Sequence, residues 1–311
     1  MRSHHKFWPR RLPHSLTVPS TSLWDNLAIS AQRYPDKVAL VFFGRTLTYR
    51  QLKEGAERLA AYLATLGVKR GDRVALCMQN CPQLVMAHFA ILRANAVVVP
   101  VNPMNRAEEL KHYITDPDTK IAITTGDLAA EWVQASDALP PAERLAHLVV
   151  TQFTDAFDAG VSGDDSPPPA WADWLGTRHP LPALQQGQAH AWSDAIACTS
   201  EPPALVVGPQ DLALLPYTSG TTGLPKGCMH PHKSIMHNAV ASALWGGWVG
   251  RQRYSGGGAH VPHHRHGQRD ACLDLQCCHH CDHAPMGPRF GGPPDFTLAG
   301  DELDEHPHHG D

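Results

Sequence analysis

The feature that most limits the fold is a regular alternation of short apolar runs with amphipathic helical patterns between residues 21 and 152. One run, AVVVPVNP at 96–103, is apolar almost throughout, which is typical of a strand buried on both faces of a sheet. Strands that alternate with helices predict an α/β fold in which helices flank a parallel, doubly wound sheet. The other runs are DRVALCMQ at 72–79, KIAITTG at 120–126 and HLVVTQ at 147–152.

The helical patterns between these runs begin at recognisable signals. In the pattern at 47–68, Thr48 and Gln51 have the spacing of a capping box, followed by a stripe of leucine and alanine. Pro82 is expected to open the next helix, because proline is tolerated in the first turn. Asn105 is the expected N-cap of the helix that follows. These signals at the helix N-termini predict where each loop between a strand and the following helix lies.

Composition excludes several classes of protein. The formal net charge of −4 gives the chain no general attraction to nucleic acid or to anionic membrane surfaces. No apolar run approaches the roughly 20 residues that span a bilayer. Residues 1–20 are basic and contain three prolines, so we expect a flexible extension rather than a targeting helix. In the absence of a secretory signal, the expected location is the cytoplasm, with cysteines present as thiols.

A loop dense in glycine, serine and threonine joins an expected strand at 211–218 to an expected helix at 232–245. It lies within LLPYTSGTTGLPKGCMHPH at 214–232 and contains one lysine before the helix, Lys226. Glycines let backbone N–H groups approach an anion, hydroxyl groups donate hydrogen bonds, and a lysine adds positive charge. The loop therefore predicts a phosphate site. It is not a Walker A motif, because Lys226 is followed by glycine rather than by serine or threonine.

The run YTSGTTGLPKG at 217–227 resembles, residue for residue, the phosphate loop of the AMP-forming acyl-CoA synthetases, which belong to the adenylate-forming superfamily. The similarity runs from about Ser15 to Trp248 and is closer to fatty or medium-chain acyl-CoA synthetases than to peptide-synthetase domains. We therefore expect a partial AMP-binding domain at 21–250, with a loop-rich excursion at 153–207. Three further stretches carry the resemblance: LTYRQL at 47–52, GVKRGDRVALCMQNCPQ at 67–83 and VVPVNPMNRAEELKHYITD at 98–116.

The resemblance implies a two-step ligase. A small-molecule carboxylate, expected to be a fatty acid, attacks the α-phosphate of ATP bound with Mg²⁺ and gives an acyl-adenylate and pyrophosphate. The thiol of coenzyme A then displaces AMP. Lys226 and Thr221 are the implied catalytic residues, because they would neutralise charge on the leaving pyrophosphate. No resident metal site is implied. The implied phosphate-binding residues are Thr218, Ser219, Gly220, Thr221, Thr222, Gly223 and Lys226.

Residues 251–311 depart from the family pattern. They contain ten histidines and four cysteines and show neither helical nor strand periodicity. The later parts of the family, which include a ribose-binding acid, a hinge and a lid with its catalytic lysine, do not appear, so we expect the chain as written to be inactive. One alternative is a truncated nucleotide-binding module with a metal-binding tail, because Cys278 and Cys281 form a CxxC pair. Further candidate ligands are Cys277, His279, His280 and His283.

A frameshift is a second interpretation of this tail. With suitable synonymous codons, residues 258–272 read one base later spell VPMFHITGMVNGMHA, which is similar to the missing continuation of the same family. Methionine has a single codon, so three methionines are hard to obtain by chance. We therefore expect the frame to slip between about residues 246 and 256. Residues 251–311 would then be an out-of-frame, disordered tail without a packed core.

Overall fold

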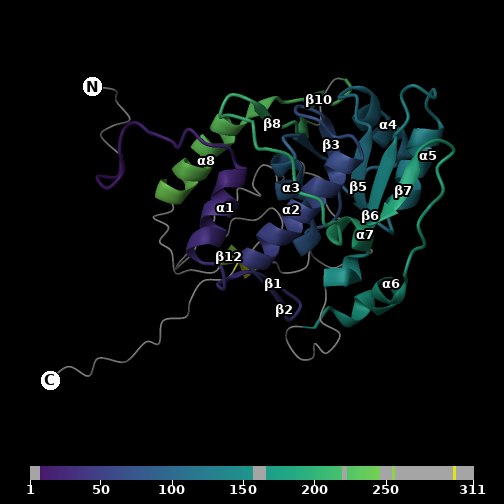
Figure 1. Ribbon diagram of the computed structural model, residues 1–311, viewed down its shortest axis with the longest axis horizontal. Helices are drawn as coiled ribbons and strands as arrows, with labels where there is room; N and C mark the ends of the chain where they lie inside the picture. The colour runs from purple at the N-terminus through teal and green to yellow at the C-terminus, as the bar shows by residue number, and fades with distance from the viewer. Residues whose placement is uncertain (1–7, 157–165, 219–222, 246–253, 256–296, 299–311) are drawn as a thin grey trace.

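Figure 1 shows a computed structural model that describes residues 8–156, 166–218, 223–245, 254–255 and 297–298. Within these residues, helices cover both faces of a mainly parallel sheet, which confirms the predicted α/β class. The described part of this sheet has seven strands in the order β11-β8-β4-β3-β5-β6-β7, and β11 is its antiparallel member. Their bounds are β3 Arg73–Cys77, β4 Val97–Pro100, β5 Ile121–Thr125, β6 His147–Thr151, β7 Gln188–Ala191, β8 Leu212–Leu214 and β11 His230–Pro231.

The centre of the sheet consists of the apolar runs seen in the sequence. Ala75 of β3 lies opposite Val99 of β4 on one side and Ala122 of β5 on the other. All four residues of β4 are buried, and all five residues of β5 are buried. Such strands need cover on both faces, which explains why their sequence is apolar without alternation.

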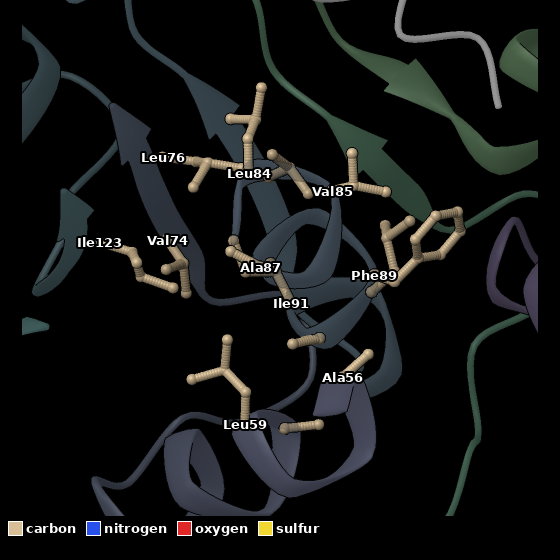
Figure 2. Packing of buried hydrophobic residues seen from close by; sticks show 14 of the residues in the cluster. Ala56, Leu59, Val74, Leu76, Leu84, Val85, Ala87, Phe89, Ile91 and Ile123 are labelled. Atoms are coloured by element: carbon tan, nitrogen blue, oxygen red, sulfur yellow. The ribbon is translucent and has the colours of Figure 1, made fainter. Parts of the chain in front are cut away.

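One face of the sheet is covered by five helices of the described chain, and together they form the larger hydrophobic core. Figure 2 shows the centre of this core, where Leu59 of α2 and Ile91 of α3 lie with Val74 of β3 and Ile123 of β5. In Figure 1, α1 and α8 lie side by side at one end. The five helices are α1 Trp24–Arg33, α2 Tyr49–Thr65, α3 Pro82–Arg93, α7 Trp192–Ile196 and α8 His232–Trp245.

The opposite face carries α4 (Ala107–Thr115) and α5 (Ala129–Asp137) over a second core. Trp132 of α5 is fully buried there and is among the largest buried side chains. Burial of one such aromatic side chain contributes about 2–3 kcal/mol, so this smaller layer still holds its helices firmly. None of the helices described is long and apolar enough to cross a membrane.

The predicted helix starts are confirmed at α2 and at α3, which begins at Pro82, and the prediction is wrong at α4. The capping box is present at α2, where the Gln51 N–H donates to Thr48 Oγ1 and the Thr48 N–H donates to Gln51 Oε1. The prediction that Asn105 caps α4 was wrong, because the N-cap position is Arg106. Its N–H donates to Glu109 Oε2 at 2.7 Å, which is the carboxylate half of a capping box.

The excursion at 153–207 contains more regular structure than the sequence indicated. Within its described residues, β7 pairs in parallel with β6 and extends the main sheet, and α7 packs on the same edge. Short elements at Phe153–Ala156, Pro169–Trp171 and Ala172–Gly176 (α6) precede them. Trp171 and Trp192 are buried and Trp174 is half-buried, so these side chains fix the excursion to the body.

A smaller sheet contains the described fragments of the tail. Its order is β12-β13-β1-β2, with β1 at Val38–Phe42, β2 at Arg45–Thr48, β12 at Tyr254–Ser255 and β13 at Thr297–Leu298. Apart from the two dipeptides of β12 and β13, residues 251–311 lie outside the described residues. The expected lack of a packed core in this tail therefore stays a prediction.

Candidate functional site

The candidate phosphate loop follows a segment that was expected to be one strand and is divided into two in the structure. The run at 211–218 was predicted as a single strand, but it divides into β8 and a second short strand, β9 (Tyr217–Thr218). Pro216 lies at the division and has no N–H to donate to a ladder, while its carbonyl accepts from the Cys228 N–H at 2.8 Å. The chain therefore leaves the main sheet just before the loop.

The two ends of the loop are held together by a short antiparallel pairing. Thr218 of β9 lies opposite Lys226 of β10 (Lys226–Gly227), and Tyr217 lies opposite Gly227. The Leu215 N–H, just before β9, donates to the Val98 carbonyl of β4 at 2.9 Å. The loop is thus placed at the carboxyl end of parallel strands, which is where open α/β sheets bind ligands. Figure 1 shows β10 close to α4.

Helix α4 holds both flanks of the loop. On the leading side, Tyr217 Oη donates to Asp116 Oδ2 at 2.5 Å, and the Tyr217 and Tyr113 rings lie 4.8 Å apart. On the trailing side, His112 Nε2 donates to the Pro225 carbonyl at 2.7 Å. Burial, followed by the hydrogen bond to Asp116, raises the pKa of Tyr217, so its hydroxyl remains a protonated donor. One helix therefore fixes the separation of the two flanks.

Three of the predicted phosphate-binding residues lie within the described part of the chain. Thr218, Gly223 and Lys226 are all exposed to solvent, and Thr218 Oγ1 donates to the Lys226 carbonyl at 3.5 Å. The pairing of β9 with β10 brings Thr218 and Lys226 together across the loop. Ser219, Gly220, Thr221 and Thr222 lie outside the described residues, so their positions stay predictions.

The sequence did not single out the residues of α4 that hold the loop. His112 and Asp116 are four residues apart, at the spacing that places two side chains on one face of a helix. Two polar side chains at this spacing, on a helix whose other face is apolar, could have indicated from the sequence that they contact another segment. The signal is weak because most such pairs are solvated, and the chain segment that they contact is about a hundred residues away.

Two cysteines and one histidine, whose side chains could take part in chemistry, have structural roles instead. Cys77 and Cys81 are fully buried, and burial raises the pKa of each thiol to about 12, so neither is an activated nucleophile. His232, which follows the loop, accepts a hydrogen bond from the Leu23 N–H at its Nδ1, at 3.0 Å. His230 is half-buried, and His237 is exposed on α8.

The metal-binding interpretation of the tail is not tested by the structure. In the part of the chain that the structure describes, no group of three or more histidine, cysteine or acidic residues is placed to hold a metal ion. The cysteine and histidine cluster at 272–283 lies outside that part.

The family is established by comparison with known proteins. Residues 27–257 match the family model described as AMP-binding enzyme. This match covers most of the chain, and the chain therefore belongs to the AMP-binding enzyme family. The resemblance found in the phosphate loop is confirmed at this level.

The relatives of the chain are considerably longer. A long-chain-fatty-acid–CoA ligase of Bacillus subtilis (strain 168) is 30% identical over 251 residues, which cover 76% of this chain and 41% of that protein. One of Escherichia coli O6:H1 is 32% identical over 239 residues, with 75% and 41% covered. The solved long-chain-fatty-acid-CoA ligase FadD1 of Archaeoglobus fulgidus shares the fold, with a TM-score of 0.59 at 24% identity and coverage of 76% and 42%. The chain thus spans about 41% of these curated relatives.

Proposed function

We propose that the chain provides the triphosphate-binding part of an adenylate-forming site for the ATP-dependent activation of a carboxylic acid. The observation that carries this proposal is the pairing of Thr218 with Lys226, fixed from behind by α4 at the carboxyl edge of the sheet. The names of the relatives support a fatty acid as the carboxylate and coenzyme A as the acceptor. We place this chemistry in the cytoplasm.

The proposed roles follow from position and charge. Lys226 supplies a positive charge to the β- and γ-phosphates, and the hydroxyls of Ser219, Thr221 and Thr222 donate to their oxygens. Thr218 would exchange its hydrogen bond to the Lys226 carbonyl for one to a phosphate oxygen. A Cβ atom added to Gly223 would meet no atom of the described residues within 4 Å. Protein packing therefore does not require glycine at this position, which supports close approach of a ligand as the reason for it. Mg²⁺ bound with ATP would neutralise further phosphate charge.

We further propose that the chain as written binds phosphate but does not complete the two-step ligase reaction. Its match to the family ends at residue 257, close to the expected slip of the reading frame. Without ribose and adenine contacts, ATP gains little affinity over its triphosphate group. ATP and inorganic tripolyphosphate should therefore bind the chain with similar affinity.

The test is calorimetric titration of the chain with ATP and with tripolyphosphate, both with Mg²⁺. Lys226→Ala should weaken the binding of both ligands roughly tenfold or more, because a hydrogen bond to a charged group contributes about 1.5–3 kcal/mol. Lys233→Ala is the matched control, because Lys233 is also exposed and lies just beyond the loop on α8. Equal affinities for wild type and Lys226→Ala would refute the proposed phosphate site.

A further inference from the structure

The second half of α8 is held less firmly by packing than the first half. The buried residues of this helix all lie within 232–239. Residues 240–243 are half-buried, and Leu244 and Trp245 are exposed. Burial of an apolar face provides most of the stability of a helix in a protein, so residues 240–245 should open easily unless another contact holds them.

The last turn of α8 receives such a contact from residues 8–14, which we call the strap. Arg11 Nη2 donates to the Trp245 carbonyl at 2.8 Å, and Arg11 Nη1 donates to the Leu244 carbonyl at 3.2 Å. Carbonyls in the last turn of a helix have no partner within the helix, and a cation there complements the negative end of the helix dipole. Figure 1 shows the N-terminal segment passing beside α8.

The strap is a compact turn that presents Arg11 to the helix. Trp8 packs edge to face on Trp245, with ring centroids 5.5 Å apart. Its Nε1 donates to the Leu12 carbonyl at 3.2 Å, and the Leu12 N–H donates to the Pro9 carbonyl at 2.9 Å. The side chain of Leu12 is buried. The guanidinium is therefore held in place before it bonds α8, which lowers the entropy cost of the contact.

Helix α8 is also the helix that follows the phosphate loop. It begins at His232, six residues beyond Lys226, and it packs on both β11 and β8. These two strands are weakly joined to the centre of the sheet, because in the described chain β8 is registered with β4 at one residue pair, Val98 with Leu214. Short pairings of this kind open without unfolding the rest of a protein. A contact that keeps α8 closed therefore also limits the opening of the strands that lead to the loop.

We propose that the strap is a conformational control of the phosphate loop. With Arg11 on the last turn of α8, the helix and its two strands stay closed and the loop keeps its binding geometry. When the strap is released, they open more often and the loop binds less well. The strap precedes residue 27, where the family match begins, so this control is not part of the matched domain. Its effect on phosphate rests on the proposed function, whereas its hold on α8 does not.

The hold on α8 is tested by hydrogen exchange of backbone amides in the whole chain. Arg11→Met keeps the aliphatic stem and removes the donors, so exchange at 240–245 should be roughly tenfold faster than in wild type. Exchange in β3 should be unchanged. Arg10→Met is the matched control, because Arg10 is the neighbouring arginine and is also exposed, and it should leave exchange in α8 as it is in wild type. Thermal unfolding verifies that both variants are folded. Equal exchange at 240–245 in Arg11→Met and wild type would overturn the proposal.

The coupling to the loop is tested by calorimetric titration with tripolyphosphate and Mg²⁺. Arg11→Met should bind roughly threefold more weakly than wild type, because a smaller fraction of the chain is in the closed form, and Arg10→Met should bind as wild type does. Linkage is reciprocal, so saturating tripolyphosphate should slow exchange at 240–245 in wild type and not in Lys226→Ala.

The outcomes separate this proposal from the proposed function. Faster exchange in Arg11→Met with unchanged affinity for tripolyphosphate would overturn control of the loop by the strap. Failure of wild type to bind tripolyphosphate would refute the proposed function and, with it, that control. The exchange data would still show in that case whether the strap holds α8.

Discussion

At the scale of single residues, His232 connects two helices that are far apart in the sequence. It begins α8, and its Nδ1 accepts the Leu23 N–H at the start of α1. Only neutral imidazole can accept this bond, because protonation places a hydrogen on Nδ1. Burial lowers the pKa of His232 to about 4, against the opposing effect of Asp211 and Asp25. The hydrogen bond that connects α1 to α8 is therefore lost when His232 is protonated.

The sign of this coupling gives a prediction for stability. In the unfolded chain His232 has a pKa of about 6.5, so it takes up a proton before the folded chain does. The free energy of unfolding therefore has its full contribution from neutral His232 above about pH 7, and this contribution falls as the pH drops from about 6.5 towards 4. At pH 5 the loss from His232 is about 2 kcal/mol. Urea unfolding at pH 7 and pH 5 measures this difference.

Two variants isolate the contribution of His232. In His232→Asn, the Oδ1 atom can accept from Leu23 and does not titrate, so the loss between pH 7 and pH 5 should shrink by about 2 kcal/mol. His237→Asn, on the exposed face of the same helix, should leave the loss as it is in wild type. If both variants retain the full loss, the pH dependence arises elsewhere.

A second prediction concerns Tyr217, whose hydroxyl joins the leading flank of the loop to α4. Tyr217→Phe removes the bond to Asp116 and should lower the free energy of unfolding by about 1 kcal/mol. It should also weaken the binding of tripolyphosphate, because the flank is no longer fixed before the ligand binds. The measurements are urea unfolding and calorimetric titration on the same preparation.

The control for Tyr217→Phe is a tyrosine on the opposite side of the sheet. Tyr62 Oη shares a hydrogen bond of 2.8 Å with His190 Nδ1, far along the sheet from the loop. Tyr62→Phe should cost similar stability and leave the affinity for tripolyphosphate unchanged. If both variants weaken binding equally, the effect of Tyr217→Phe is a general loss of stability rather than a local one.

At the scale of secondary-structure elements, β7 depends on one glycine. Gly187 precedes β7 and has a φ of +98°, and a Cβ atom there would lie 2.6 Å from the backbone oxygens of Leu145 and Ala146. These oxygens cannot move without disturbing the chain that leads into β6. The Ala146 carbonyl also accepts the Gln188 N–H at 2.9 Å, which starts the β6–β7 pairing.

We therefore expect Gly187→Ala to detach β7 from the sheet. Gly71→Ala is the matched control, because Gly71 has a φ of +83° and its Cβ would meet no atom of the described chain within 4 Å. Both changes carry the cost of a left-handed conformation, about 1–2 kcal/mol. Gly187→Ala should lose at least about 2 kcal/mol more in urea unfolding because of the backbone clash. Equal losses would show that the clash is relieved at little cost.

The same elements show what the sequence could and could not predict. The β3, β4, β5 and β6 strands were predicted because each is a buried apolar run of ordinary length. Strand β7 was missed because QAHA has no apolar periodicity, and its place in the sheet comes from pairing with β6 and from Gly187. The division at Pro216 was missed because LALLPYT reads as one run. The hydrogen bond from the Leu215 N–H to the Val98 carbonyl of β4, just before Pro216, decides where the run bends.

The candidate site divides in the same way. The phosphate loop could be predicted from its residue types. Close approach of the backbone to a phosphate requires glycine, and the phosphate charge requires hydroxyl groups and a lysine nearby in the sequence. The contacts of α4 with the loop could not be predicted. His112 and Pro225 are 113 positions apart in the chain and come into contact only in the folded protein. Contacts at such separations have no local signature in a single sequence.

At the scale of the whole molecule, the reading frame is the most consequential prediction. Resequencing the coding DNA across codons 240–311 and beyond, with translation in all three frames, tests it. We expect the shifted frame to continue for several hundred codons and to encode a lid with its lysine. The restored protein should then exchange labelled pyrophosphate into ATP in the presence of a carboxylate, and the chain as written should not.

The alternative result is equally clear. If the shifted frame closes within a short distance, residues 251–311 are the native tail, and the frameshift hypothesis is wrong. Zinc titration of the chain would then test whether the cysteines and histidines at 272–283 bind a metal.

The order of the strands has a consequence for the exchange of backbone amide hydrogens. Strand β3 is paired over four residues on each side, whereas β8 and β11, beside the phosphate loop, contain three and two residues. Amide protection should therefore fall from β3 towards β11, because short outer strands open without unfolding the rest. The loop is attached to the end that opens first. Occupancy of the loop should thus be visible as slowed exchange at Leu214 and Leu215, in a measurement that needs neither turnover nor a known carboxylate.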